Sequence, residues 1–369
     1  MNNLFFIHTP LQMLIAQQVI HQEDLKNNVL MYGFIGDNKQ FIDIYKLLII
    51  DNLWENDKIY FDNLPGCADL TLRHPFTCFA KIISNVKKID KIIEDKNIDT
   101  VYISDIDNIS YQFIMFHLKN KVKINVFEEG ISHYIYYTHK AYERNFQKAQ
   151  EWLLDNLFFK PVFGFKFANY WYREGNYDNL PIDQRWSIIP NYFKKSYDRQ
   201  LNIDYSFISE KTISYINKEI KSVNEHSNVI FIITSIVYGH IDKQIYQERY
   251  DAYLKTIYKY IVGLPEDATV IVKLHPRENA NVISDIKEIG VKSKHQVIFI
   301  SKELNIPVEL YLQRLRPSAI TVFCNSSSIY NGFLYPKCKI TDLIHSFFEI
   351  CEKNHYNIED LKEAHKNIV

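Results

Sequence analysis

The chain has 369 residues, 47% of them hydrophobic and 24% charged, a composition that indicates a globular protein and excludes a disordered one. This length exceeds what one ordinary core accommodates, so we expect two domains. The 43 lysines and arginines nearly balance the 44 aspartates and glutamates, which gives a net charge of −1 and no overall attraction to nucleic acid.

The first half of the chain alternates short apolar segments with longer helical patterns. Residues 4–8 are predicted to form a buried strand, followed by Pro10 at the first position of an amphipathic helix. Polar residues and this proline interrupt the opening apolar stretch, so it is not expected to span a membrane. Further strands are predicted at residues 29–34, 58–61, 100–104 and 123–127, with a helix at 76–96. This alternation predicts a parallel, doubly wound sheet.

Residues 157–181, LFFKPVFGFKFANYWYREGNYDNLP, are rich in aromatic side chains and follow the first predicted sheet. Two interpretations stay open. The segment is either a hydrophobic connector that packs against both domains or a surface that meets a membrane or a partner subunit, because interfacial aromatic residues beside Lys and Arg suit both. It is our candidate for peripheral membrane contact and for the interface of a homodimer.

The second half repeats the scheme of the first. Strands are predicted at residues 228–234, 268–274, 296–300, 319–323 and 338–341, and helices at 243–262, 307–314 and 327–334. We therefore expect an α/β protein of GT-B type, in which two Rossmann-like, doubly wound domains face a central cleft. The predicted divisions are an N-terminal domain at 1–156, the aromatic connector at 157–190, a C-terminal domain at 191–345 and a C-terminal helical tail at 346–369.

Ligands of such sheets bind at the carboxyl ends of the strands, and polar residues gather there in the first domain. They are Thr9, Gln12, Asp105, Asp107, Glu128, Glu129 and Gly130. Asp105-x-Asp107 is the pattern by which metal-dependent glycosyltransferases of the GT-A class hold manganese, but that class has one Rossmann-like domain. The two glutamates belong either to a solvated turn, with Gly130 at positive φ, or to a site where one carboxylate works while its neighbour points away.

Hydroxyl and imidazole groups follow the predicted strands of the second domain. The candidates are Thr234, Ser235, Lys273, His275, Pro276, Glu303, Ser326, Ser327 and Ser328. Serines at a helix N-terminus, with its free backbone N–H groups, suit a phosphate, although one serine that merely caps the helix is the alternative. His275 either has a structural role or hydrogen-bonds such a phosphate and donates a proton as it leaves.

The five cysteines form no CxxC pair, and their number is odd. Together with the lack of a signal peptide and of lipidation motifs, this predicts a reducing, cytoplasmic compartment and argues against a zinc site. A peripheral position on the inner face of the cytoplasmic membrane is compatible with the aromatic connector.

Three stretches together, FEEG, KLHPRE and NSSSIY, resemble in order and spacing the D/E-D/E-G, HP and serine motifs of bacterial sialyltransferases that use CMP-sialic acid. The opening NLFFIHTPLQMLIAQQVI looks like the first strand and helix of glycosyltransferase family 52, the lipooligosaccharide sialyltransferases. EEGISHY and NSSSIYNGFL are similar to family 38, the capsular polysialyltransferases. The resemblance covers nearly the whole chain as architecture and four short stretches as motifs. Unlike many lipooligosaccharide enzymes, the chain shows no N-terminal anchor.

The resemblance implies a role for most of these residues. Glu129 would be the general base of the acceptor domain, and His275 would contact the CMP phosphate in the donor-binding domain, with general acid as its alternative role. Ser326, Ser327 and Ser328 would hold the same phosphate, and Glu303 would bind the ribose hydroxyls. The further candidates for donor binding are Lys273, Pro276, Thr9 and Gln12, and the other cleft candidates are Glu128, Gly130, Asp105, Asp107, Thr234 and Ser235.

The implied activity is that of an inverting, metal-independent sialyltransferase without a cofactor. It would transfer sialic acid from CMP-sialic acid to a galactose-terminated glycan, with lipid-linked lipooligosaccharide as the expected acceptor. The alternatives are a capsular polysaccharide or polysialic acid transferase, a transferase that uses another CMP-sugar such as CMP-Kdo, and a scaffold that lost the chemistry.

Overall fold

A computed structural model describes most of the chain. The described residues are 1–33, 42–56, 58–61, 75–104, 109–128, 153, 156–157, 160–163, 180–189, 196–223, 228–275, 278–279, 281–301, 304, 306–323, 335 and 337–366.

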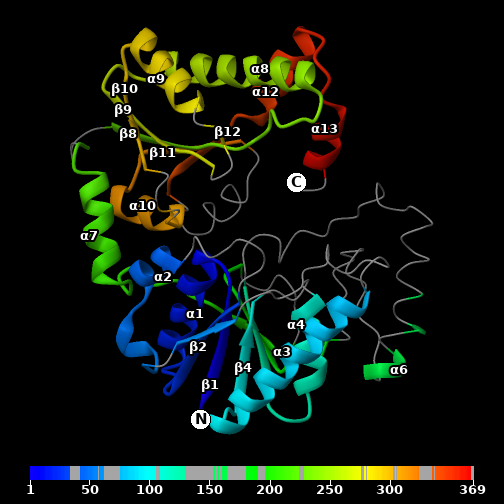
Figure 1. Ribbon diagram of the computed structural model, residues 1–369. Coiled ribbons are helices and arrows are strands. Elements are labelled where there is room, and N and C mark those ends of the chain that lie inside the picture. The colour runs from blue at the N-terminus through cyan, green and yellow to red at the C-terminus, as the bar shows by residue number, and fades with distance from the viewer. Residues whose placement is uncertain are drawn as a thin grey trace. The chain divides into compact units, whose positions relative to one another are not determined.

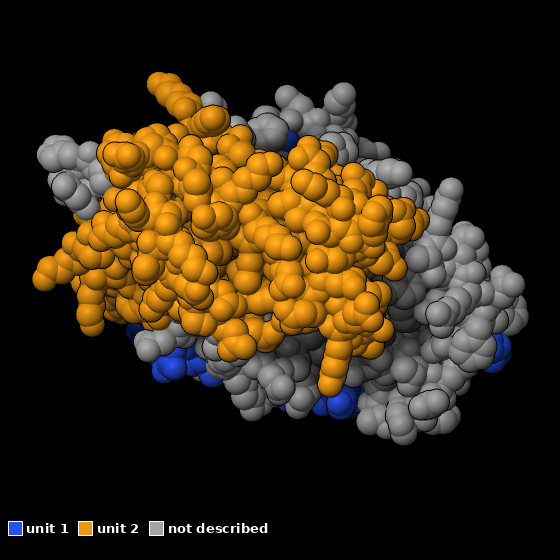
Figure 2. Space-filling model, turned by 90° about the horizontal axis from the view of Figure 1, so that it is seen from above, with its two compact units in different colours: residues 1–209 blue, residues 210–369 orange. Residues whose placement is uncertain are grey.

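The chain divides into two compact units, residues 1–209 and residues 210–369 (Figure 2). Each unit contains one sheet in which all paired strands are parallel, with helices on both faces of the sheet (Figure 1). The prediction of two Rossmann-like, doubly wound α/β units is therefore confirmed.

The sheet of the first unit has seven strands in the order β3-β2-β1-β4-β5-β6-β7. Their bounds are Asn3–Ile7 (β1), Asn28–Gly33 (β2), Ile59–Phe61 (β3), Thr100–Ile103 (β4), Lys123–Phe127 (β5), Gln184–Ser187 (β6) and Asp198–Gln200 (β7). Every residue of β1 and β2 is buried, because helices cover both faces of the sheet. This explains why these strands are continuous apolar runs in the sequence rather than alternating ones.

The helices of the first unit lie on opposite faces of its sheet (Figure 1). Their bounds are Pro10–Gln22 (α1), Ile42–Leu48 (α2), Pro75–Asp95 (α3), Ile109–Leu118 (α4) and Lys160–Phe163 (α6), with a 3₁₀ turn at Asp51–Leu53. Leu4 and Phe6 of β1 share one core cluster with Ile89 of α3 and Met115 of α4. The opposite face of β1 presents Phe5, whose ring stacks on that of Tyr102 at 4.2 Å between centroids.

The sheet of the second unit has five strands in the order β10-β9-β8-β11-β12. The strands are Asn228–Ile233 (β8), Ala268–Lys273 (β9), Gln296–Phe299 (β10), Ala319–Val322 (β11) and Lys339–Asp342 (β12). The helices are Glu210–Glu219 (α7), Lys243–Val262 (α8), Asn281–Ser293 (α9), Val308–Leu315 (α10), Ile344–Lys353 (α12) and Glu359–Lys366 (α13). In Figure 1, α8 and α9 lie over one face of this sheet and α10 over the other.

The first unit extends beyond the predicted N-terminal domain, which ends at residue 156. Strands β6 and β7 lie within or after the predicted connector, yet both pair in the first sheet, where Arg185 of β6 donates to Asp198 of β7 at 2.8 Å. Most of the aromatic stretch 157–181 lies outside the described residues, so its predicted membrane and subunit contacts stay predictions.

The predicted helical tail at 346–369 is part of the second unit's core. Phe347 and Cys351 of α12 are fully buried in one cluster with Tyr253 of α8. The buried Arg249 of α8 donates from Nε to the carbonyl of Asn357 at 2.8 Å and from its terminal nitrogens to Asp360, which fixes the start of α13.

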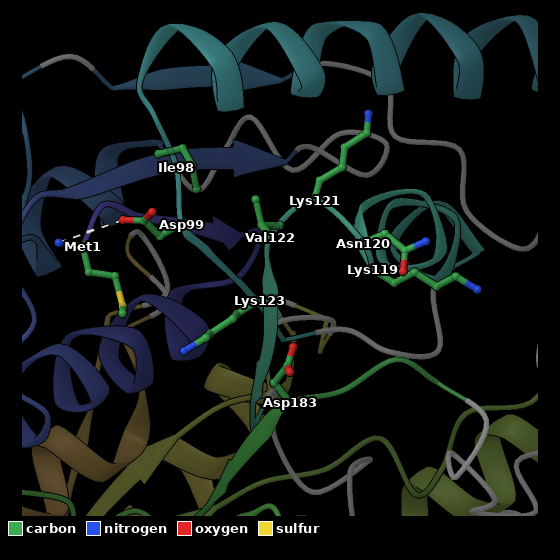
Figure 3. Close-up of a pocket in the computed structure, with 9 residues that line it drawn as sticks. All are labelled: Met1, Ile98, Asp99, Lys119, Asn120, Lys121, Val122, Lys123 and Asp183. Carbon is green, nitrogen blue, oxygen red and sulfur yellow. Dashed lines mark ion pairs between the residues drawn. The ribbon is translucent and has the colours of Figure 1, made fainter.

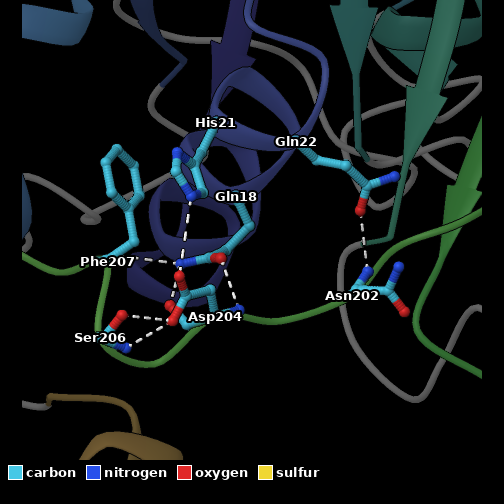
Figure 4. Close-up of polar contacts among 7 residues, drawn as sticks. All are labelled: Gln18, His21, Gln22, Asn202, Asp204, Ser206 and Phe207. Atoms are coloured by element: carbon cyan, nitrogen blue, oxygen red, sulfur yellow. Dashed lines mark hydrogen bonds and ion pairs between the residues drawn. The ribbon is translucent and has the colours of Figure 1, made fainter.

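The segment that ends the first unit is held against α1 (Figure 4). The side-chain nitrogen of Gln18 donates to the carbonyls of Asp204 and Phe207 at 3.1 and 3.0 Å, and its oxygen accepts from the Asp204 N–H at 2.9 Å. The Phe207 ring stacks on that of His21 at 3.8 Å between centroids. The last stretch before residue 210 is thus fixed to the first unit.

No helix in the described part of the chain is long and apolar enough to span a bilayer.

Candidate active site

The strand order identifies one switch point in each sheet. In the first sheet the strands run outward from β1 to β3 on one side, and the chain then crosses back to place β4 on the other side of β1. In the second sheet the strands run from β8 to β10, and β11 then lies on the other side of β8. Ligands of open parallel sheets bind beside the carboxyl ends of the strands at such points. The residues that follow β1, β4, β5, β8, β9 and β11 are therefore the candidates for a ligand site.

The residues after β1 form the cap of α1. The backbone N–H of Gln12 donates to the hydroxyl of Thr9 at 3.3 Å, and Oε1 of Gln12 accepts from the N–H groups of His8 and Thr9 at 2.8 and 3.2 Å. This reciprocal capping box satisfies the free donors at the start of the helix. Thr9 and Gln12, predicted to bind the donor, thus serve the local fold through the contacts that the structure describes.

His8 lies at the carboxyl end of β1 and is only 7% exposed. Its Nε2 lies 3.2 Å from Nε2 of Gln12, and its Nδ1 lies 3.2 Å from the hydroxyl of Tyr111 on α4. Because the Gln12 oxygen accepts two backbone N–H groups, its amide nitrogen donates to Nε2 of His8, which leaves the proton on Nδ1. Burial lowers the pKa of His8 to about 4, so the ring is neutral at pH 7. None of the sequence motifs points to a role for this residue.

The first acid of the FEEG stretch is part of the first unit's own structure. Glu128 follows β5 directly and is fully buried. Its Oε2 accepts from the backbone N–H of Ile188 at 2.7 Å, and its own N–H donates to the carbonyl of Trp186 at 3.1 Å. The carboxylate therefore holds the segment after β6. The predicted base, Glu129, and the neighbouring Gly130 lie outside the described residues.

Asp105 and Asp107, which follow β4, also lie outside the described residues. Ser104, the last described residue before them, is buried, and its hydroxyl has no hydrogen-bond partner among the described residues. Within the described part of the chain, no group of three or more His, Cys, Asp or Glu side chains is arranged to hold a metal ion.

A buried polar cluster joins the ends of β8 and β9 in the second unit. The backbone N–H of His275 donates to the hydroxyl of Thr234 at 2.8 Å and to Oε2 of Glu278 at 2.9 Å. The Thr234 hydroxyl itself donates to Oε2 of Glu278, while Oε1 of that carboxylate accepts from the hydroxyl of Tyr253 at 2.9 Å. Thr234 and Glu278 are 1% and 6% exposed, and His275 is half-buried. The backbone of the predicted histidine is thus fixed at the strand end.

Lys273, the last residue of β9, turns its amino group toward α10. Its Nζ lies 5.4 Å from the ring centroid of Tyr311, and the residue is 8% exposed. Burial lowers the pKa of Lys273 to about 8, and the carboxylates of Glu219 and Glu309 oppose this shift. The position of the Lys273 side chain is therefore explained by contacts within the second unit.

The remaining predicted residues of the second unit divide into two groups. Ser235 is half-buried directly after Thr234. Pro276, Glu303, Ser326, Ser327 and Ser328 lie outside the described residues. Strand β11 ends at Val322 beside β8, where Thr321 is paired with Ile232, so the chain that carries the three serines leaves the sheet next to the Thr234 strand.

The structure also shows an open depression of about 670 Å³ at the amino ends of strands in the first sheet (Figure 3). It is lined by Asp99 before β4, by residues 119–123 leading into β5, and by Asp183 before β6. These positions precede the strands, whereas the predicted site residues follow them. The depression therefore contains none of the predicted site residues.

Comparison with known proteins decides the family. The model of the alpha-2,8-polysialyltransferase (POLYST) family matches residues 3–343. The chain belongs to this family. It is accordingly a glycosyltransferase of a sialyltransferase family, as the FEEG, KLHPRE and NSSSIY motifs predict. No curated protein sequence matches the chain significantly.

Solved structures share the fold of this glycosyltransferase at low sequence identity. A putative UDP-N-acetylglucosamine 2-epimerase from Listeria monocytogenes is 11% identical, with a TM-score of 0.51 over 100% of this chain and 90% of its own. A sialyltransferase from Photobacterium damsela is 16% identical, with a TM-score of 0.49 over 92% and 72% of the two chains. UDP-GlcNAc 2-epimerase from Neisseria meningitidis is 14% identical, with a TM-score of 0.48 over 96% and 93%. The first likeness supports the GT-B-type fold.

Proposed function

We propose that the chain is an inverting, metal-independent sialyltransferase that transfers sialic acid from CMP-sialic acid to a glycan acceptor. The observation that carries the proposal is the family match over residues 3–343. The fixed backbone of His275 and the structural use of Glu128 support the assignment of roles within the motifs.

The reaction is a single displacement. An acceptor hydroxyl oxygen forms a bond to the anomeric carbon of sialic acid while its proton passes to the carboxylate of Glu129. The bond from the anomeric carbon to the phosphate oxygen breaks, and CMP leaves with the electron pair. Attack opposite the leaving group inverts the β-linked donor to an α-linked product.

The leaving group explains why the proposal needs no metal ion. CMP carries one phosphate and hence less charge than a nucleoside diphosphate. The imidazole of His275, the hydroxyls of Ser326, Ser327 and Ser328, and backbone N–H groups at a helix start are donors of the kind that stabilise such a charge.

Glu128 and Glu129 receive different roles in this proposal. Glu128 accepts the Ile188 N–H inside its unit, so its charge is used to hold the fold. Successive side chains of an extended segment point to opposite faces, which favours Glu129 as the carboxylate available for proton removal.

The galactose-terminated glycan of lipooligosaccharide is the acceptor that we propose first. The family match favours extension of a sialic acid polymer equally, and this is the second candidate. The chain length of the product separates the two, because a capping enzyme adds one residue to a galactose-terminated oligosaccharide and stops. A polymerase instead elongates a sialylated primer into a ladder. We propose that either reaction takes place in the reducing, cytoplasmic compartment predicted from the cysteines.

A donor screen that monitors CMP release tests the proposal. The purified chain is incubated with a mixture of galactose-terminated and sialylated acceptors, with CMP-sialic acid or CMP-Kdo, with and without EDTA. We expect acceptor-dependent release from CMP-sialic acid at the same rate in EDTA. Release from CMP-Kdo alone, or a strict need for manganese, would contradict the proposal.

A further inference from the structure

The side chain of Glu278 has no assigned role, although it touches the backbone of the predicted phosphate-binding histidine. It follows His275 by three residues, and its own N–H donates to the His275 carbonyl at 3.0 Å, which closes a turn after β9. Its carboxylate lies within this turn and is almost completely shielded from water.

The partners of this carboxylate come from three separate elements. Thr234 follows β8, Tyr253 is on α8, and the His275 N–H follows β9. A buried carboxylate is costly unless it accepts several hydrogen bonds, and a fully satisfied buried network holds its members in one geometry. Glu278 therefore connects the ends of two adjacent strands to the helix that covers them.

The position of His275 depends on this connection. Its backbone N–H is shared between the Thr234 hydroxyl and Glu278 Oε2, at 2.8 and 2.9 Å. The Thr234 hydroxyl also donates to the same carboxylate oxygen, so Thr234 is oriented by Glu278. Loss of the carboxylate charge would weaken both restraints on the histidine at once.

We infer that Glu278 is a positioning residue of the transferase, which sets the imidazole of His275 for contact with the donor phosphate. The inference rests on the proposed function. Glu278 acts through His275 and Thr234 rather than on the substrate, because both of its oxygens accept hydrogen bonds inside the protein.

Glu278→Gln removes the charge of the side chain. It also replaces one of the accepting oxygens by an amide NH₂ group, which would face the hydrogen-bond donors that now point at the carboxylate. We expect CMP affinity and turnover each to fall about 10- to 100-fold, the effect of losing hydrogen bonds to a buried charged group. Tyr253→Phe keeps the carboxylate and removes one of the donors described above, so the same losses should be smaller. Asp285→Asn is the matched control, because Asp285 also accepts from a tyrosine of α8, Tyr250 at 2.5 Å, but does not contact His275.

A double-mutant cycle with His275→Ala distinguishes positioning from general damage. CMP affinity by calorimetry and turnover with CMP-sialic acid are measured for the wild type, each single variant and the double variant. If Glu278 acts through His275, Glu278→Gln has its full effect in the wild type and little further effect once His275 is alanine. Thermal unfolding of each protein confirms that it is folded. If Glu278→Gln does not fold, the same cycle is measured with Tyr253→Phe in its place.

The outcomes separate this inference from the proposed function. The inference would be overturned if the wild type binds CMP and the variants Glu278→Gln and Tyr253→Phe bind it with the same affinity. Equal losses in both backgrounds would also overturn it, because the effect would not pass through His275. A wild-type protein that neither binds CMP nor turns over CMP-sialic acid would instead overturn the proposed function.

Discussion

The carboxylate of Glu128 accepts the backbone N–H of Ile188 at 2.7 Å, so the first acid of the FEEG stretch joins β5 to the segment after β6. Two adjacent carboxylates at a strand end thus need not compete for one task. Glu128 stabilises the sheet, and in our proposal Glu129 is the general base.

Substitution of the two glutamates should give different results. Glu129→Gln should lower turnover at least 100-fold with CMP binding retained, given the contribution of about 10²- to 10⁴-fold that is typical of a general base. Glu128→Gln keeps an oxygen that accepts the Ile188 N–H, so turnover should stay within about threefold while stability falls by about 1–2 kcal/mol. Steady-state kinetics and urea unfolding measure both. An inactive Glu128→Gln beside an active Glu129→Gln would reverse the assignment.

His8 should make stability depend on pH. The pKa of the folded-state imidazole is about 4, against 6.5 for the unfolded chain, because burial disfavours the charged ring. The unfolded chain therefore binds more protons between these values, and stability falls as the pH drops from 6.5 to 4, by up to about 3 kcal/mol. Above pH 6.5 the His8 ring is neutral in both the folded and the unfolded state, so its titration no longer lowers the stability.

The pH dependence is measured by urea unfolding of the wild type and of His8→Gln between pH 4 and 7.5. His8→Gln should show a flatter curve below pH 6.5, whereas the exposed His240→Gln should match the wild type. Parallel curves for the wild type and His8→Gln would show that His8 does not titrate as described.

Gln18 and Gln17 offer reciprocal controls on one helix. Gln18 accepts the N–H of Asp204 at 2.9 Å, whereas Gln17 accepts that of Ile50 at 2.7 Å, and both glutamines are buried. Gln18→Leu should speed hydrogen exchange at the Asp204 amide at least about tenfold and leave Ile50 unchanged, and Gln17→Leu should do the reverse. Amide exchange followed by mass spectrometry reads both sites. Equal acceleration at both amides in either variant would mean that α1 loosens as a whole.

Arg249 should stabilise the C-terminal helices of the second unit. Arg249→Met removes a donor to the Asn357 carbonyl and the pair with Asp360, so the free energy of unfolding should fall by about 2–3 kcal/mol. The exposed Arg314, which donates to Asn217 at 2.7 Å, is the control, and Arg314→Met should cost less than about 0.5 kcal/mol. Urea unfolding compares them, and similar losses in the two variants would contradict the anchoring role.

The sequence predicts those strands that are covered on both faces, because their apolar runs are continuous, as in β1 and β9. It does not reveal β6 and β7, whose sequences QRWS and DRQ are polar. Arg185 is buried there because Asp198 of the neighbouring strand accepts its hydrogen bonds. Hydrophobic periodicity carries no signal for such a pair.

The candidate site also contains residues that the sequence predicts and residues that it does not. The KLHPRE motif identifies His275 as a residue of interest and ends at Glu278, but it gives no role to Glu278, whose partners Thr234 and Tyr253 lie 44 and 25 residues away in the chain. Thr9 and Gln12 carry polar groups that suit a ligand, yet their reciprocal bonds form the cap of α1. Which polar groups the fold uses for itself depends on tertiary contacts that the sequence alone does not show.

A crystal structure with CMP or a fluorinated CMP-sialic acid tests the central claim most directly. The account predicts that the phosphate lies within hydrogen-bond distance of the His275 imidazole and the hydroxyls of Ser326 to Ser328, with Glu129 beside the sugar. A nucleotide bound at the amino ends of the first sheet, in the depression beside Asp99 and Asp183, would contradict it, as would a His275 ring that does not contact the phosphate.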